Sequence, residues 1–400
     1  MKLVGYNEFS GRHWETGSVR NVWAYRGVKA PHTDAPFSEA FLLGVSGGIV
    51  MGYFTFAYQG YDPEVRILTR NTFDPLNTLL SRLGVVQHIR QTASADTGLA
   101  NLQETLTDGL PAIVWADMFS LPYNALPHDE NMWAMFPLVV YGFDAAADTV
   151  WIADRAQVPL TVRLSELAAA RARVKNHKFR LMTIDPPQPQ KLKTAVLAGL
   201  WDTIKLFTEK PPKGAKKNFG FAAYQNWADL LVKAKGRGSW AAEYASDGRL
   251  YAVLTSAFTD IALFGKADWA DRDLFADFLQ EAALLLDKPA LADIAPQFRA
   301  SGRAWADLGA ALLPDGVPLL QETRELLLRR RDVFLTQGGA GLEEIRGING
   351  RLAAIKQTAA EDFPLSAAET AVLRETIRDS VLTIHDMEKE ALTAVRDALS

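Results

Sequence analysis

A short proline-rich segment at residues 185–190, DPPQPQ, is the feature that most constrains the fold of this chain. Its three prolines fix φ and remove backbone donors, so the segment favours an extended linker over a helix. A chain of 400 residues is long enough for about two domains of ordinary size. The sequence therefore predicts two domains, residues 1–185 and 186–400, that are joined at this linker.

Short helices and strands alternate before the linker. Asp74 and Pro75 supply a cap and a first helical residue, and Gly84 ends that helix. A second helix is predicted at residues 97–108, and strands are predicted at residues 85–92, 112–116, 138–143, 149–153 and 178–184. A short turn separates the strands 138–143 and 149–153, which indicates a hairpin. We therefore expect an α+β domain around a mainly antiparallel sheet.

Apolar residues follow a helical period beyond the linker. One apolar face consists of Leu342, Ile345, Ile348, Leu352 and Ile355, and a second consists of Leu373, Ile377, Val381, Ile384, Leu392, Val395 and Leu399. Ser366 and Glu369 have the spacing of a capping box at the start of the last helix. The second domain is therefore expected to be all-α.

Composition excludes several classes of function. The chain has no cysteine, which excludes disulfides, thiolate metal sites and a thiol nucleophile. Its net charge of -4 and interspersed acids and bases offer no basic face for a nucleic acid. The basic cluster at residues 209–217, EKPPKGAKK, is expected to be a solvated loop. The first residues lack a signal-peptide pattern, so a cytoplasmic location is expected.

One uncharged stretch, residues 40–58, has 19 residues and approaches the length of a membrane span. Gly44, Gly47, Gly48 and Gly52 divide it into a short helix, a turn and a strand. The same glycines lack the lysine and the full spacing of a phosphate-binding loop. We therefore expect neither a membrane partner nor a phosphate loop here.

Residues 11–27, GRHWETGSVRNVWAYRG, are typical of a loop that leads into a helix near Glu15 and ends at Gly27. Position 14 then lies at the positive end of a helix. Such an end lowers the pKa of a thiol, and its backbone amides can hold an oxyanion. The residue at this position is Trp14.

This segment resembles the corresponding segment of the butirosin-biosynthesis protein H family, in which a Gly-x-His-Cys loop precedes a helix. Gly11 and His13 match that pattern, and Trp14 stands at the cysteine position. Residues 139–144 and 151–154 are similar to the two strands that complete the family's site. Their alignment implies that Phe136 stands at the histidine position and that Asp154 keeps the position of the orienting aspartate.

The resemblance covers nearly the whole chain. Residues 117–123, which begin with Asp117, resemble the family's loop before the histidine, and residues 218–228 and 264–283 resemble the helical domain of unknown function that often follows. The resemblance implies a papain-like, cysteine-protease-like fold for residues 1–185. It also implies an acyltransferase that moves an acyl group from a phosphopantetheine carrier protein to an amine.

The two substitutions remove this chemistry, because neither an indole nor a phenyl ring can attack a thioester or accept a proton. No cofactor is expected beyond acyl-phosphopantetheine on a carrier protein as a substrate. Trp14 and Phe136 are expected to touch each other, with Asp154 nearby. The expected lining of the former cleft is Trp14, Glu15, Ser18, Tyr123, Trp133 and Phe136.

Other residues offer weaker sites. Ser10, Thr16 and Ser18 lie near the helix start, but a hydroxyl nucleophile needs an oriented base within about 3 Å. The simpler interpretation is that Thr16 or Ser18 caps the helix amides and that His13 packs or bonds to backbone. The other histidines show no metal-ligand spacing and are His32, His88, His128, His177 and His385.

Three interpretations follow. In the first, the chain is a pseudoenzyme that binds an acyl carrier protein or pairs with a catalytically intact paralogue. In the second, it is an active acyltransferase or hydrolase that acts on acyl-carrier thioesters through Asp117, Asp154, His13 or a hydroxyl. In the third, it carries an apolar ligand. The sequence favours the first, because both reacting groups are lost, and it leaves the oligomeric state open.

Overall fold

The computed structural model describes residues 1–127, 131–245, 247–262 and 269–400. The chain forms two compact units. The sheet unit comprises Met1–Leu42, Leu80–Leu192 and Arg330–Gly347, and the helical unit comprises Leu43–Leu79, Lys193–Arg329 and Ile348–Ser400. The division after Leu192 lies just beyond the proline-rich linker. The domain limits at 1–185 and 186–400 stay a prediction.

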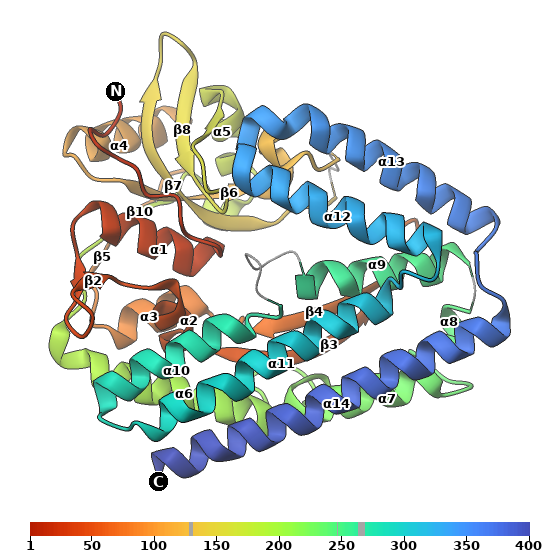
Figure 1. Ribbon diagram of the computed structural model, residues 1–400. Helices are drawn as coiled ribbons and strands as arrows, with labels where there is room; N and C mark the ends of the chain where they lie inside the picture. The colour runs from red at the N-terminus through yellow and green to blue at the C-terminus, as the bar shows by residue number, and fades with distance from the viewer. Residues whose placement is uncertain (128–130, 246, 263–268) are drawn as a thin grey trace. The chain divides into compact units, whose positions relative to one another are not determined.

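The sheet unit contains a six-stranded antiparallel sheet in the order β5-β10-β6-β7-β8-β9 (Figure 1). Its strands are β5 (Gln87–Arg90), β6 (Ala112–Asp117), β7 (Met135–Asp144), β8 (Thr149–Ala153), β9 (Leu160–Val162) and β10 (Leu181–Ile184). The predicted hairpin is present as β7 and β8. The three residues of β9 are too few to show a strand pattern in the sequence, and β9 is not predicted.

Among the described residues, three helices pack on the two central strands β6 and β7 of this sheet. The helix expected at residues 15–26 is α1 (Trp14–Tyr25), which packs on β7. α4 (Ala95–Thr107) and α5 (Leu164–Ala172) both pack on β6. A small ladder joins β1 (Lys29–Ala30) to β2 (Ala35–Pro36). The start of α1 is thereby held beside the sheet.

The uncharged stretch at residues 40–58 has the three parts that its glycines predict. It contains α2 (Glu39–Val45), a turn, and β3 (Ile49–Phe56). Gly47 and Gly48 adopt φ angles of +114° and +67°, which side chains disfavour. Among the described residues, no helix has the length and apolar character that a membrane crossing requires.

The helical unit is built around a hairpin of β3 and β4 (Glu64–Arg70). Its helices are α6 (Leu192–Thr208), α7 (Gly220–Val232), α8 (Trp240–Glu243), α9 (Gly248–Ala262), α10 (Arg272–Leu286), α11 (Ala290–Leu312) and α14 (Ala367–Leu399). α14 runs along α7 and α11 (Figure 1). The chain passes between the units within α2, α3 (Pro75–Arg82), α12 (Pro318–Gln337) and α13 (Leu342–Glu361).

Two predictions for the second half of the chain are confirmed. In the described part of the chain no strand follows Ile184, so the region beyond the linker is helical and the fold is α+β. The capping box of Ser366 and Glu369 opens α14, and the two residues exchange both of its hydrogen bonds.

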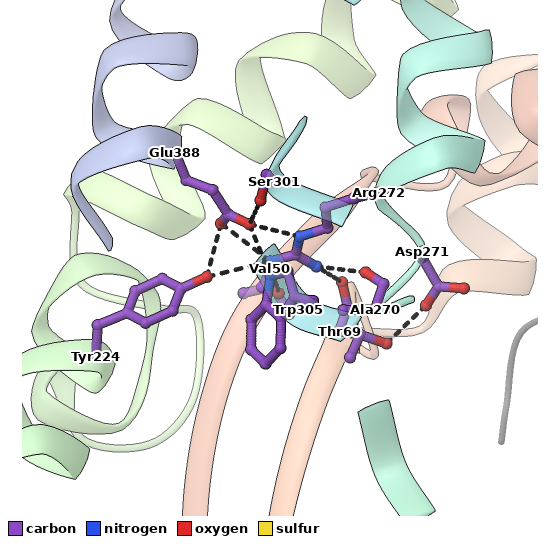
Figure 2. A network of polar contacts seen from close by, with 9 residues as sticks. All are labelled: Val50, Thr69, Tyr224, Ala270, Asp271, Arg272, Ser301, Trp305 and Glu388. Carbon is purple, nitrogen blue, oxygen red and sulfur yellow. Dashed lines mark hydrogen bonds and ion pairs between the residues drawn. The ribbon is translucent and has the colours of Figure 1, made fainter. Parts of the chain in front are cut away.

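A buried ion pair joins the helices of the helical unit to its hairpin (Figure 2). Arg272 of α10 donates to Glu388 of α14 from Nε at 2.7 Å and from Nη2 at 3.0 Å, and both side chains are fully buried. The Glu388 carboxylate also accepts from three more side chains, those of Tyr224, Ser301 and Trp305, at 2.7, 2.7 and 3.0 Å. The guanidinium also donates to three backbone carbonyls, those of Val50, Thr69 and Ala270.

This network satisfies a charge pair that burial alone would destabilise. Burial raises the pKa of the Glu388 carboxyl, but the Arg272 charge and the hydrogen bonds outweigh it, so the pKa is lowered. This pair is not predicted from the sequence. The sequence feature that could have indicated it is the position of Glu388, four residues from both Ile384 and Leu392. This spacing places a carboxylate on the apolar face of α14.

Candidate functional site

The first turn of α1 is where the sequence places the former nucleophile. His13 is the N-cap in extended conformation, and Trp14 is the first helical residue. The backbones of Gly11 and Gly17 touch, because a Cβ on Gly11 would lie 2.5 Å from the Cα of Gly17. The loop before the helix is therefore folded onto it, and this fixes Trp14 at the helix end.

Glu39, the first residue of α2, occupies the positive end of α1. Its carboxylate accepts from the backbone N–H of Arg12 at 2.6 Å and of His13 at 2.8 Å, and from the Thr16 hydroxyl at 2.8 Å. A buried carboxylate in this place complements the helix dipole. The backbone amides of Arg12 and His13, just before the helix, therefore already hold an anion of the protein itself.

Trp14 lies at the centre of a stack of flat groups. Its ring stacks on Phe136, with centroids 3.9 Å apart and planes inclined by 11°. The guanidinium carbon of Arg155 lies 4.5 Å from the Trp14 centroid and 5.1 Å from that of Phe334. Since Phe136 covers one face of the indole, Arg155 covers the other, where a cation and an aromatic ring attract each other.

We call Phe136, Trp14, Arg155 and Phe334 the aromatic stack. The contact expected between Trp14 and Phe136 is present. Arg155 and Phe334 are additions that the sequence analysis does not identify. Arg155 could have been suspected, because it directly follows Asp154, a predicted site residue. Nothing in a single sequence links residue 334 to residue 14.

Asp154 has substitute donors in place of an imidazole. The Tyr123 hydroxyl donates to its Oδ2 at 3.1 Å, and Arg155 Nε lies 3.4 Å from its Oδ1. Burial and the Asp154 charge raise the pKa of Tyr123, so its hydroxyl stays a proton donor. Arg155 is also held by Asn124, whose Oδ1 accepts from Nη2 at 2.7 Å. The Asp154 carboxylate, at the former orienting position, is therefore already bound by Tyr123 and Arg155.

The hydroxyls near the helix start do not cap it as the simpler interpretation expects. Thr16 donates to Glu39, and Ser18 donates to the carbonyl of Pro137 at 3.4 Å. Both side chains are buried, whereas Ser10 is exposed. The Glu39 carboxylate instead bonds the two amides that precede the helix, because its two oxygens reach the N–H groups of Arg12 and His13 at once.

Asp117 organises a loop at the end of β6. Its carboxylate accepts from the Ala134 N–H at 2.8 Å and from the Ser120 hydroxyl at 2.6 Å, and it is fully buried. Arg173 Nε lies 3.9 Å from the same carboxylate. These bonds give Asp117 a structural role, which is to hold the loop after β6.

The remaining predicted positions are dispersed. Trp133 is 57% exposed, and Glu15 is half-buried in the first turn of α1. Across the described residues no group of three or more His, Cys, Asp or Glu side chains is arranged to hold a metal ion. His128 lies outside the described residues, as do residues 264–268 of the segment that resembles the helical domain.

A cavity of about 290 Å³ in the sheet unit lies among other residues. Its lining consists of Arg26, His88, Arg90, Thr105, Asp108, Leu110, Leu181, Thr183, Ile184 and Asp185. None of the predicted pocket residues lines it. Three of its titratable groups are in close polar pairs, His88 with Asp185 at 3.2 Å and Arg90 with Glu104 at 2.6 Å.

Comparison with known families agrees with the order of these parts. Residues 13–155 match the family described as Butirosin biosynthesis protein H, N-terminal. The chain belongs to the butirosin-H-like family. Residues 164–318 match the Domain of unknown function (DUF4872). A search of curated proteins found no match.

Removal of the Glu39 carboxylate tests its role at the helix start. We expect Glu39→Ala to lower the free energy of unfolding by about 1–3 kcal/mol, because buried amides lose their acceptor. Glu39→Gln keeps an acceptor oxygen and should lose less. Urea denaturation measures both, with Glu104→Ala, an exposed partner of Arg90, as the control. An equal loss in Glu39→Ala and Glu104→Ala would contradict the assignment.

Proposed function

We propose that this butirosin-H-like protein is a pseudoenzyme that acts by non-covalent binding in a biosynthetic acyl-transfer pathway. The observation that carries the proposal is the aromatic stack, in which Trp14 and Phe136 fill the two former reacting positions and lie against each other. We also propose that the sheet unit is a degenerate papain-like domain. Its antiparallel sheet, with a helix that begins at position 14, supports this.

Three features together oppose catalysis at the former site. Aromatic rings stand at the reacting positions, the amides just before the helix hold Glu39, and Asp154 holds Tyr123 and Arg155. A covalent acyl transfer needs a nucleophile, a base and an oxyanion site that are free at the same time. The proposed partners are an acyl carrier protein or a catalytically intact paralogue, in the cytoplasm.

The test is incubation of the purified protein with acyl-loaded carrier proteins, followed by intact-mass measurement. We expect no acyl adduct on the protein, because it has no thiol and its buried hydroxyls are committed to Glu39 and Pro137. A family member that retains cysteine and histidine serves as the positive control. An adduct on Ser10, Thr16 or Ser18 would overturn the proposal.

One contact favours the alternative of an active acyltransferase or hydrolase with relocated groups. The Thr16 hydroxyl lies 2.8 Å from Glu39, the geometry of a nucleophile and a base. However, both oxygens of this carboxylate already accept a backbone N–H bond, one from Arg12 and one from His13. Thioester hydrolysis that disappears in Thr16→Val and persists in Ser18→Ala would promote this alternative.

A further inference from the structure

A row of aromatic side chains runs outward along β3 in the helical unit. It begins at the buried Phe219, whose ring centroid lies 5.4 Å from that of Phe54. Phe56 follows at 6.4 Å from Phe54, and Tyr58 at 6.2 Å from Phe56. Phe54 and Phe56 alternate along β3, so they share one face of it, and Tyr58 lies two residues beyond the end of the strand. The row leads from the core into solvent, where Phe56 is 37% and Tyr58 is 65% exposed.

Four exposed lysines lie in the loop that leads to Phe219, namely Lys210, Lys213, Lys216 and Lys217. The segment Lys216–Asn218 contacts β3, and Phe219 directly after it pairs with Gly52 in an antiparallel bridge. The loop is therefore held against the strand by its own aromatic anchor. With Glu209 as its acidic residue, this loop is positive in a chain whose net charge is -4.

We infer that the aromatic row (Phe54, Phe56 and Tyr58) and these four lysines form a docking surface for an acidic protein that presents an apolar patch bordered by carboxylates. The inference rests on the proposed binding role and names the chemistry of its partner. Aromatic rings supply contact area at low cost in side-chain entropy, and lysines at the rim attract carboxylates. The positive loop beside an exposed apolar row selects this partner by charge complementarity.

The acidic residues of the hairpin favour a protein over a lipid surface. Glu64 lies opposite Phe56 in the strand register, on the face of the aromatic row. An anionic membrane repels a carboxylate on that face, whereas a protein can place a donor opposite Glu64. Asp62, the other acid of the hairpin end, is already paired with Lys356.

Fluorescence anisotropy with a labelled peptide tests the surface. The probe is an amphipathic helical peptide with glutamate on one face and leucine on the other, and its companion carries glutamine for glutamate. We expect the full-length protein to bind the acidic peptide, and the affinity to fall as salt screens the lysines. Lys216→Glu with Lys217→Glu should weaken binding by at least about fivefold, and Phe56→Ser with Tyr58→Ser should do the same.

The matched control is Lys233→Glu with Lys235→Glu, an equal charge change on two exposed lysines after α7. It should leave binding within about twofold of the wild type, so an equal loss there would overturn the inference. No binding of the acidic peptide, equal binding of the glutamine peptide, or binding only to phosphatidylglycerol vesicles would overturn it as well.

A phosphopantetheine carrier protein as a second probe separates this inference from the proposed function. If the carrier binds and the Lys216 and Lys217 changes leave its affinity unaltered, the proposed function stands and the surface is wrong. If the acidic peptide binds at the lysines while neither a carrier protein nor an intact paralogue binds, the surface stands and the proposed partners are wrong.

Discussion

Replacing Glu388 with alanine lowers the free energy of unfolding of the helical unit by about 3–5 kcal/mol, which is the expected cost of breaking a buried ion pair. The change leaves the Arg272 charge without its bidentate partner, and both side chains are fully buried. It also removes the acceptor for Tyr224, Ser301 and Trp305. Glu388→Gln keeps the shape but not the charge and should also destabilise the unit strongly.

A double-mutant cycle separates the pair from its surroundings. Arg272→Met with Glu388→Leu should destabilise less than the sum of the two single changes, because it leaves no unpaired buried charge. Arg299→Ala is the matched control, since Arg299 of α11 pairs with the exposed Asp277 of α10 at 2.6 Å. Its loss should be below about 1 kcal/mol by urea denaturation. Additive single changes at Arg272 and Glu388 would contradict the coupling.

The lowered pKa of Glu388 fixes the direction of the pH effect. A carboxyl with a lower pKa in the folded state stabilises that state above its unfolded pKa. This stabilisation is lost as the pH falls through the folded pKa. The wild type should therefore lose stability in acid, and the loss should be smaller in Arg272→Met with Glu388→Leu, which carries neither group.

Elements with local steric signals are the ones that the sequence predicts well. Pro75 begins α3 and Gly84 follows its end with φ +64°, and Gly27 follows α1 with φ +68°. These limits depend on the residue itself and not on distant contacts. β5 and β10 are shorter than predicted, because the register of their pairing covers only residues 87–90 and 181–184.

The partners of the site are harder to predict, since they come from distant parts of the chain. The family pattern places Trp14 and Phe136 together, and the structure agrees. Glu39 and Phe334 have no local pattern that points to position 14. A sequence pattern thus identifies which reacting groups are missing, and only the fold shows what has filled their places.

Restoring the family residues alone should not restore a reactive thiol. In Trp14→Cys with Phe136→His, the introduced thiol directly follows two residues, Arg12 and His13, whose amides are bound by the Glu39 carboxylate. A nearby negative charge disfavours the thiolate, and the thiolate is the reactive form. Asp154 remains bonded to Tyr123 and close to Arg155, so it does not orient the new imidazole. We expect alkylation by iodoacetamide at the rate of an ordinary exposed thiol or slower.

Adding Glu39→Gln to this double variant removes the negative charge and should raise the alkylation rate at pH 7 by at least about tenfold, because the thiolate fraction increases. The chain has no other cysteine, so alkylation reports the introduced thiol alone.

Glu15→Gln is the matched control, since it removes one carboxylate from the same helical turn and should change the rate by less than about threefold. The pH profile of the rate should shift downward only with Glu39→Gln. If the double variant already reacted fast, with a low midpoint in its rate–pH profile, Glu39 would not suppress the reactivity of a thiol at position 14. The substitutions at positions 14 and 136 alone would then account for the difference from catalytic relatives.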